Sequence, residues 1–323
     1  MAVIETRELR KTYGRIEALK GVSLRVEPGQ VYGLLGQNGA GKTTLIKILL
    51  GIVHKTTGDA TLLDHAAGDA ATRKRVGYLP EDHAFPVYHT GYSLMDFYGQ
   101  LYGVSPDERR RRIPEMLEQV GIAGRMHSKI RTYSKGMKQR LGIAQALFHD
   151  PQVIFLDEPT DGVDPVGRRE IRDIMQRLKE DGRTIFLNSH LLGEVELICD
   201  RVAILQRGEL VREGTVADLT KQTGLFVVGL AAGQAFPADD VIRLGYKVTP
   251  AAGGYHEVGL PEGKGIDPVL ALLAQKALSL RHLVEKKQSL EDLFVSIVDA
   301  AEPGTDGRPG KGVRAVGGPR GRS

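Results

Sequence analysis

The chain of 323 residues has no tryptophan, a single cysteine and only 6% aromatic residues. A disulfide needs two cysteines, so Cys199 excludes an internal one and fits a reducing cytosol. No apolar run approaches the ~20 residues that a membrane-spanning helix needs. The first residues also lack the apolar core of a signal peptide. We therefore expect a chain that does not itself cross a membrane.

The chain also lacks a strong charge imbalance in its larger part. Of the formal net charge of +4, residues 301–323 carry +3, from five basic and two acidic residues. The one dense basic run outside them, residues 109–112, we interpret as a solvated helix face. We therefore expect no nucleic-acid partner. Residues 301–323 are rich in glycine and proline without an apolar period, which predicts disorder.

What the sequence does contain is a phosphate-binding loop. Residues 36–43 fit the pattern G-x-x-x-x-G-K-[ST], between an apolar strand-like run at 31–35 and a helical pattern from 44 to 50. Backbone N–H groups of such a loop, and the helix N-terminus behind it, point at phosphate oxygens. Lys42 can reach the terminal phosphates. The residues expected to bind a nucleotide here are Gly36, Asn38, Gly39, Ala40, Gly41, Lys42, Thr43 and Thr44.

Two carboxylates follow a second apolar strand. Residues 153–156 are of the kind that forms a buried parallel strand, and Asp157 and Glu158 come directly after them. Open α/β sheets bind ligands at this edge. We expect Asp157 to hold Mg²⁺ beside the Thr43 hydroxyl, and Glu158 to polarise a water for attack on the γ-phosphate. The alternative is that the two carboxylates only cap the end of the strand. The phosphate loop elsewhere in the sequence favours the catalytic interpretation over this one.

Two further segments are less specific. A third strand-like run, residues 184–188, is followed by His190, whose imidazole is able to contact a γ-phosphate. Ser134 is a good helix N-cap, and Gly136 permits close approach of a ligand to the backbone. On these residues alone, an ordinary capped helix is the simpler interpretation of the second segment.

Taken in order, these motifs resemble the ATP-binding-cassette (ABC) nucleotide-binding subunits over roughly residues 3–220. The resemblance implies that Tyr13 stacks on adenine and that residues 133–137 occupy the place of the Leu-Ser-Gly-Gly-Gln signature. It also implies that the loop 161–164, with Asp164 at its acidic position, couples two active sites. His190 matches the switch histidine. The nucleotide contacts that it adds are Tyr13, Ser134, Gly136 and Asp164; the catalytic residues that it implies are Glu158, His190 and Lys42.

Three departures from the family pattern stand out. The signature reads Tyr-Ser-Lys-Gly-Met; Glu81 replaces the usual lid glutamine after residues 77–80; and Asp161 replaces a serine or asparagine. Glutamate still offers oxygen to Mg²⁺, which makes the expected metal set Thr43, Glu81 and Asp157. The first two departures resemble a branch of exporter-type ATPases whose membrane partner is a separate six-helix subunit.

The resemblance also implies a fold and a division into domains. We expect an α/β fold: a P-loop ABC cassette at 1–220, with a mostly parallel core sheet, an antiparallel β subdomain and a helical subdomain at about 83–150. Its aromatic stretches 85–89 and 92–102 are candidates for docking on the membrane subunit. Residues 221–300 should form a small α+β domain, and their β-α-β-β-α-β pattern suggests a ferredoxin-like sandwich.

The motifs occur once, so one chain holds only half of each site of the family. We expect a two-fold homodimer with ATP between the phosphate loop of one subunit and the signature of the other. It would power export through a separate permease, as a peripheral protein on the cytoplasmic face of the cell membrane. The alternative is a regulatory, ribosome-acting or DNA-acting ABC ATPase. Ribosome-acting members usually carry two cassettes and DNA-repair members a long coiled coil; this chain has neither.

Overall fold

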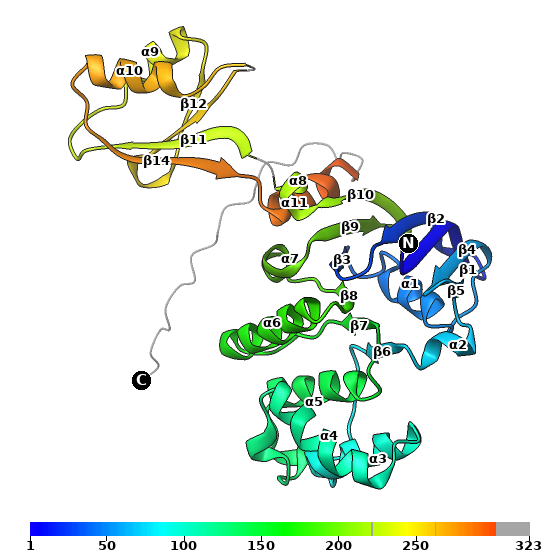
Figure 1. Cartoon of the computed structure of the whole chain (residues 1–323). Coiled ribbons are helices and arrows are strands. Elements are labelled where there is room, and N and C mark those ends of the chain that lie inside the picture. Colours follow the sequence, from blue (N-terminus) through cyan, green and yellow to red (C-terminus); the bar gives the residue numbers. More distant parts are fainter. Residues whose placement is uncertain (221, 262, 302–323) are drawn as a thin grey trace, which may run out of the picture.

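The computed structural model describes residues 1–220, 222–261 and 263–301. The disorder expected for residues 301–323 therefore lies outside the described residues except at Ala301, the last residue of a helix. Three sheets organise the described part of the chain. Two of them lie within residues 1–220, and the third forms a separate layer at the opposite end from the helices of the middle region (Figure 1).

The central sheet contains the strands that carry the motifs. Its members are β3 (Val31–Leu35), β6 (Val76–Leu79), β7 (Val153–Asp157), β8 (Thr184–Asn188), β9 (Arg201–Gln206) and β10 (Glu209–Thr215). The order is β10-β9-β3-β8-β7-β6; β10 pairs antiparallel with β9, and the other pairings are parallel. The predicted mostly parallel core sheet is therefore confirmed. The carboxyl ends of β3, β7 and β8 meet at one edge, where the motifs follow.

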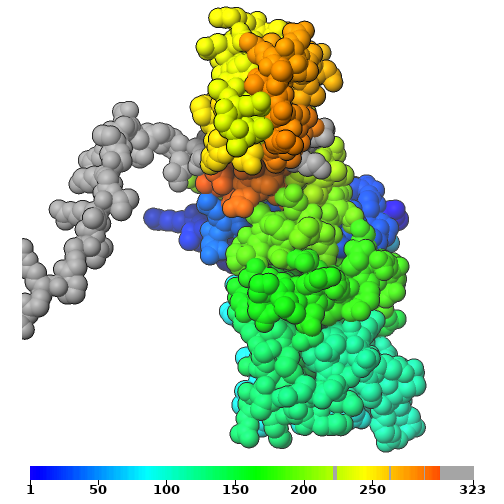
Figure 2. All heavy atoms as spheres, turned by 90° about the vertical axis from the view of Figure 1, so that its left-hand side faces the viewer, coloured from blue at the N-terminus to red at the C-terminus, as the bar shows by residue number. Residues whose placement is uncertain are grey.

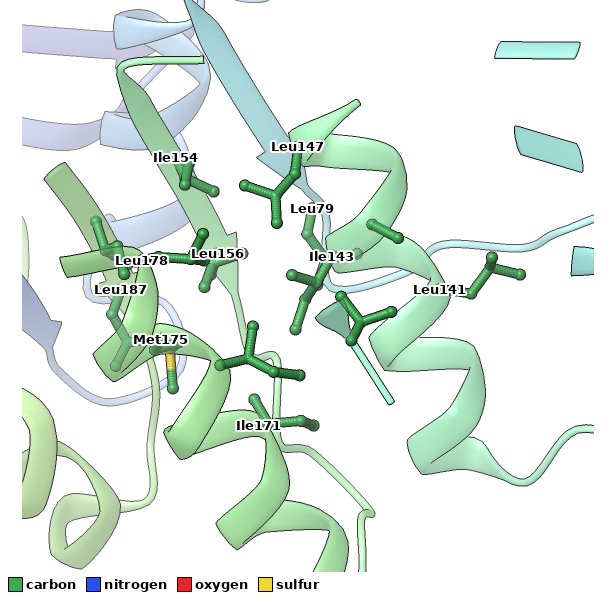
Figure 3. Packing of buried hydrophobic residues seen from close by; sticks show 14 of the residues in the cluster. Leu79, Leu141, Ile143, Leu147, Ile154, Leu156, Ile171, Met175, Leu178 and Leu187 are labelled. Atoms are coloured by element: carbon green, nitrogen blue, oxygen red, sulfur yellow. The ribbon is translucent and has the colours of Figure 1, made fainter. Parts of the chain in front are cut away.

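The central strands bury alternate residues in two cores, because both faces of the sheet are covered. Tyr32 and Leu34 of β3 belong to the core shared with helix α1 (Lys42–Leu49), whereas Val31 and Leu35 belong to the other. Figure 3 shows part of this other core, in which the strands meet helices α5 (Lys135–Leu147) and α6 (Pro165–Glu180). This two-sided burial fixes the register of the strands, and with it the direction in which each motif leaves the sheet.

An antiparallel sheet covers α1 from the other side. It is made of β1 (Ile4–Tyr13), β2 (Ile16–Val26), β4 (Thr57–Leu62) and β5 (His65–Ala66), in the order β2-β1-β4-β5. Its inward residues, such as Ile4, Leu19 and Leu62, pack on α1 residues in one core. The short helix α2 (Ala70–Arg73) leads from it to β6. This sheet is the antiparallel subdomain that the resemblance implies.

The middle region is helical from residue 91 onward. It contains α3 (Gly91–Leu101), α4 (Pro106–Gln119), the 3-10 turns η1 (Ala123–Arg125) and η2 (Ile130–Thr132), and α5. Side chains at each start accept a backbone N–H: Thr90 for α3, Ser105 for α4 and Ser134 for α5. These caps explain why the helices begin where they do.

The solvated face expected for residues 109–112 is only half correct. Arg110 and Arg111 are exposed, but Arg109 Nε donates to Asp96 Oδ1 at 2.7 Å, and Arg112 donates to the Phe148 carbonyl at 2.8 Å. Positions 109 and 112 are three residues apart and therefore lie on the same face of the helix, which here faces the neighbouring helices. The run therefore ties α4 to α3 and α5.

Residues 222–287 form the third sheet. After α7 (Leu192–Ile198) and α8 (Val216–Leu219) come β11 (Gln222–Leu230), α9 (Ala238–Arg243), β12 (Lys247–Pro250), the turn η3 (Ala252–Gly254), β13 (His256–Gly259), α10 (Asp267–Gln275) and β14 (Leu280–Lys287). The sheet is antiparallel with the order β12-β13-β11-β14, and α9 and α10 lie on the same face (Figure 1). Val228, Val241, Val258, Val269 and Leu273 close a core of its own. The boundary expected at 220/221 stays a prediction.

The last described helix, α11 (Leu290–Ala301), returns the chain to the cassette. Leu290 is fully buried in the core that contains α5, α6 and α7, and its N–H donates to Glu196 Oε2 of α7 at 3.0 Å. In the space-filling view α11 lies at the junction between the cassette and the C-terminal sheet (Figure 2). The C-terminal part is thus anchored on the helix that follows His190.

We expect Leu290→Ala to lower the free energy of unfolding by about 2–5 kcal/mol, because it leaves a cavity in the cassette core. Urea denaturation monitored by circular dichroism would measure it. Val295→Ala on the same helix, where the side chain is 50% exposed, is the control. Equal effects of the two substitutions would contradict the proposed anchoring.

Candidate active site

A cavity of about 880 Å³ lies at the carboxyl edge of the central sheet. Each motif-bearing strand contributes to its wall: the phosphate loop follows β3, Glu81 follows β6, Glu158 follows β7, and Ser189 and His190 follow β8. All the residues predicted to form the phosphate loop contact it, namely Gly36, Asn38, Gly39, Ala40, Gly41, Lys42, Thr43 and Thr44. The fold therefore brings together motifs that are up to about 150 residues apart in the sequence.

The phosphate loop needs its glycines for steric reasons. Gly41, the N-cap of α1, has φ of +107°, and a Cβ there would lie 2.5 Å from the Ala18 carbonyl oxygen. The loop therefore presses against the start of β2. A bulkier residue would push the loop away from β2.

Lys42 is the charged centre of the loop. Its side chain is buried, and Nζ donates to the carbonyls of Gly36 at 2.7 Å and Gln37 at 3.3 Å. Burial lowers the pKa of the ammonium, and the nearby carboxylates of Glu158 and Asp157 raise it in opposition. A buried cation whose hydrogen bonds go to loop carbonyls is well placed to receive an anion.

Glu158 occupies a constrained position. Its φ is +52°, in the left-handed region that non-glycine residues rarely adopt, and its N–H donates to the Asn188 carbonyl at 2.8 Å. Its carboxylate accepts from the backbone N–H of His190 at 3.3 Å and lies 2.8 Å from His190 Nδ1. Burial raises the pKa of this carboxyl group, and His190 partly offsets the rise. The geometry holds one carboxylate oxygen against β8 at the cavity wall.

Asp157 is buried behind Glu158. Its Oδ1 accepts from Asn188 Nδ2, and burial raises the pKa of its carboxyl group. It does not itself line the cavity in the described part of the chain, although Asn188 does. The Asn188 Oδ1 atom is buried and has no hydrogen-bond partner among the described residues. This leaves one acceptor beside Asp157 for a group that the protein does not supply.

The candidate ligand atoms near Asn188 fit Mg²⁺. Thr43 and Glu81 line the cavity and Asp157 lies behind it, so all three candidate ligands offer oxygen. No group of three or more histidine, cysteine, aspartate or glutamate side chains able to hold a metal occurs among the described residues. Mg²⁺ typically takes one or two carboxylates together with water and substrate phosphates, which this small set permits.

Four residues assigned from the resemblance lie outside this cavity in the single chain. Ser134 is exposed at the start of α5, where it accepts the Met137 N–H at 3.2 Å, and Gly136 follows it. Asp164 caps α6 by accepting the Gly167 N–H at 2.8 Å. Tyr13 is 44% exposed, and the Lys11 ammonium stands 4.6 Å from its ring centre. The cavity of one chain is thus lined by the phosphate loop and by Glu158 but not by the signature residues.

The structure adds wall residues that the sequence did not indicate. Ile16 and Lys20 of β2 line the cavity, as do Arg207 in the β9–β10 turn and Phe294 of α11. Phe294 also packs against the core that contains α7. No motif marks these positions.

A strand–glycine loop–helix with a buried lysine, beside a carboxylate at the end of a neighbouring parallel strand, defines a P-loop nucleotide-hydrolysing protein. Comparison with known proteins specifies the class further. The family model described as "ABC transporter" matches residues 19–161. The chain belongs to this family: it is an ATP-binding subunit of an ABC transporter, an ATPase whose hydrolysis of ATP powers transport.

Curated relatives cover different lengths of the chain. An uncharacterized ABC transporter ATP-binding protein of Synechocystis is 48% identical over 241 residues, 72% of this chain and 68% of the relative. The bacitracin transport ATP-binding protein BcrA of Enterococcus faecalis is 32% identical over 301 residues, 92% of this chain and 96% of the relative. The second match therefore includes the C-terminal part.

Solved structures confirm the cassette fold. CbiO1 from Clostridium perfringens, described as part of an ABC transporter complex, gives a TM-score of 0.63 with 28% identity, over 68% of this chain and 90% of that one. The family and its relatives support the transport ATPase over the ribosome-acting, DNA-acting or regulatory alternative. No helix in the described ranges is long and apolar enough to span a bilayer. ABC ATP-binding subunits of this kind work with membrane permeases.

The raised pKa of Glu158 predicts a pH-dependent effect on stability. A carboxyl group whose pKa is higher in the folded than in the unfolded state contributes stability below its unfolded pKa, and this contribution is lost as pH rises through the folded pKa. We therefore expect nucleotide-free Glu158→Gln to be more stable than wild type at neutral pH, with the difference closing as pH falls towards the ordinary value of 4.5.

Thermal denaturation at several pH values would measure this difference. Asp161→Asn is the control of opposite sign, because Lys135 lowers the pKa of Asp161. That variant should be slightly less stable than wild type at neutral pH. A Glu158→Gln protein that is less stable than wild type at neutral pH would contradict the account of Glu158.

Proposed function

We propose that the cavity binds ATP with Mg²⁺ and that Glu158 is the general base of hydrolysis. One observation carries the proposal: the buried Lys42 ammonium and the buried Glu158 carboxylate both lie in the wall of one cavity. The group that binds phosphate and the group that activates water are thus two different residues that face the same cavity. The raised pKa of Glu158 brings this base closer to the pH at which it works.

The remaining residues have distinct roles in this proposal. Lys42 and the loop N–H groups hold the β- and γ-phosphates. Thr43, Glu81 and Asp157 hold Mg²⁺, which neutralises phosphate charge when bound. His190 fixes the Glu158 carboxylate through Nδ1, and its second ring nitrogen is free to contact the terminal phosphate. Glu158 takes the proton of the attacking water as the water oxygen bonds to the γ-phosphorus, and the bond from that phosphorus to the β–γ bridging oxygen breaks, which releases ADP and phosphate.

The working unit proposed here is a homodimer. Ser134 and Gly136 are accessible at the start of α5 but lie outside their own chain's cavity. A two-fold dimer places each signature opposite the partner's phosphate loop, with two equivalent sites. ATP then favours the closed state because only that state offers both sets of contacts. Hydrolysis removes the γ-phosphate and with it these contacts. Tyr13, on the exposed end of β1, would turn onto the adenine.

The permease would dock on the helical region. Exposed apolar side chains gather between residues 87 and 102: Val87, Tyr88, Phe97, Leu101 and Tyr102, each at least 41% exposed. Grouped exposure of this kind is typical of an interaction surface. The segment begins shortly after the cavity residue Glu81, so a shift at Glu81 is transmitted along one short stretch of chain.

Export is the proposed direction, and the cytoplasmic face of the cell membrane the proposed location. The bacitracin relative is named for transport and a Bacillus subtilis relative, 37% identical, for linearmycin resistance. Both names fit removal of a compound from the cell. We assign residues 221–300 to an accessory domain that acts through α11, because Leu290 and Phe294 connect it to the cassette.

Replacing the proposed base should abolish turnover. We expect Glu158→Gln to reduce ATP hydrolysis by about 100-fold or more and to elute as a dimer in size-exclusion chromatography only when ATP and Mg²⁺ are present. Glu180→Gln, an exposed carboxylate on α6, is the matched control and should behave as wild type. Equal hydrolysis by Glu158→Gln and wild type would remove Glu158 from the mechanism.

A charge on the docking surface should separate the chain from its membrane partner. Tyr88 is 68% exposed and Ile52, outside this surface, 58%. We expect Tyr88→Glu to lose the membrane protein that co-purifies with tagged chain from native membranes, because a desolvated carboxylate opposes burial. ATP turnover of the isolated chain should stay unchanged. The proposal fails if Ile52→Glu loses the partner equally, or if Tyr88→Glu retains it.

A further inference from the structure

Two of the departures from the family pattern contact each other. Lys135 stands at the third position of the signature, and Asp161 at the first position of the loop 161–164. In the structure Lys135 Nζ lies 2.8 Å from Asp161 Oδ2, in an ion pair that joins the start of α5 to the turn after β7. The two unusual side chains are therefore physically complementary.

The backbone between them makes room for this contact. Gly162 has φ of +60°, and a Cβ added there would collide with Lys135 Nζ and lie 3.0 Å from both Cδ and Cε. The lysine stem thus crosses directly over Gly162 to reach Asp161. Any larger residue at position 162 would displace it.

Asp161 connects Lys135 to the catalytic turn. Its N–H donates to the Glu158 carbonyl at 3.2 Å, and its side chain borders the nucleotide cavity. It also borders a second cavity of about 330 Å³, whose wall includes Glu81, Lys135 and Lys138. The ion pair therefore lies between the signature and the wall of the nucleotide site in the same chain.

This ion pair is of the kind that a phosphate is able to replace. The side chains of Lys135 and Asp161 are 53% and 49% exposed, and exposed pairs contribute little to stability. The lysine ammonium is a compact charge on a flexible stem. The N-terminal end of α5 adds positive potential next to it. A terminal phosphate carries more negative charge than the single carboxylate of Asp161, so it competes effectively for the ammonium.

We propose that Lys135 is a phosphate-contacting residue of the composite ATP site, held by Asp161 of its own chain until the partner's ATP arrives. On dimer closure Nζ leaves Asp161 and pairs with the terminal phosphate bound to the partner's loop. Lys135 therefore favours closure and Asp161 opposes it. This inference rests on the proposed dimer.

The test measures the ATP concentration that gives half-maximal dimer, by light scattering, in the Glu158→Gln background with Mg²⁺. Lys135→Gln should raise that concentration about tenfold, because a charge-assisted hydrogen bond is lost. Asp161→Asn should lower it about threefold, because a competing carboxylate is removed. In the presence of Lys135→Gln, Asp161→Asn should have no further effect.

Controls separate this role from a structural one. Lys138→Gln changes a neighbouring lysine of the same helix and cavity and should leave dimerisation unchanged. Lys135→Arg keeps the charge and should restore most of the ATP sensitivity. The affinity of the Lys135→Gln monomer for ADP should be unaffected, since ADP binds to the chain's own loop and Lys135 does not line that cavity.

A failure of the Lys135 role and a failure of the proposed dimer would give different results. If Lys135→Gln and Lys138→Gln behave alike, or if Asp161→Asn weakens the dimer, Lys135 has no such role, although the dimer itself stands. If the Glu158→Gln protein forms no ATP-dependent dimer at all, the proposed sandwich is wrong and the role of Lys135 is wrong with it.

Discussion

The site depends on keeping one ammonium group and two carboxylates largely out of water at one edge of a parallel sheet. Lys42, Asp157 and Glu158 are each less than 10% exposed. Burial works against the charged form of all three, so each is held by fixed neighbours: loop carbonyls, Asn188 and His190. Those neighbours come from β3 and β8. The sheet register that aligns these strands is therefore also what sets the spacing of the charges.

The same arrangement bears on the proposed dimer. A single chain assembles the phosphate loop and the buried Glu158 carboxylate but leaves Ser134 at the surface, capping its own helix. In the proposed dimer, the free energy of completing the site would come only from contacts between chains. Two regions of the cassette would respond together to a change at the cavity. Glu81 is followed in the chain by the exposed apolar side chains near Tyr88. His190 is followed by α7, the helix on which α11 is anchored.

The local parts of this structure could be predicted from the sequence, because each rests on a short-range rule. The apolar runs at 31–35, 153–156 and 184–188 became β3, β7 and β8, and the glycine loop followed β3 as its motif requires. The resemblance supplied the order of the elements, and the family and fold are confirmed. The roles of individual site residues stay predictions.

Contacts between distant segments could not be predicted in this way. Phe294 reaches the nucleotide cavity because Leu290 of the same helix is buried in a core whose other buried members lie between residues 31 and 204, and no local pattern encodes that docking. The pairing of Lys135 with Asp161 depends on the space above Gly162. Arg109 and Arg112 turn inward because acceptors on α3 and after α5 happen to face them. Each case needs three-dimensional packing, which periodicity alone does not contain.

The most direct test of the account is complementation between two inactive chains. Lys42→Ala removes the phosphate contact of one chain, and Ser134→Arg blocks the signature of another. In a mixed dimer both defects fall in the same site, and the second site is intact. An equimolar mixture should therefore recover about a quarter of wild-type ATP turnover, since half of the dimers are mixed and each has one of two sites working. Turnover no greater than that of the two variants measured separately would contradict a site shared between chains.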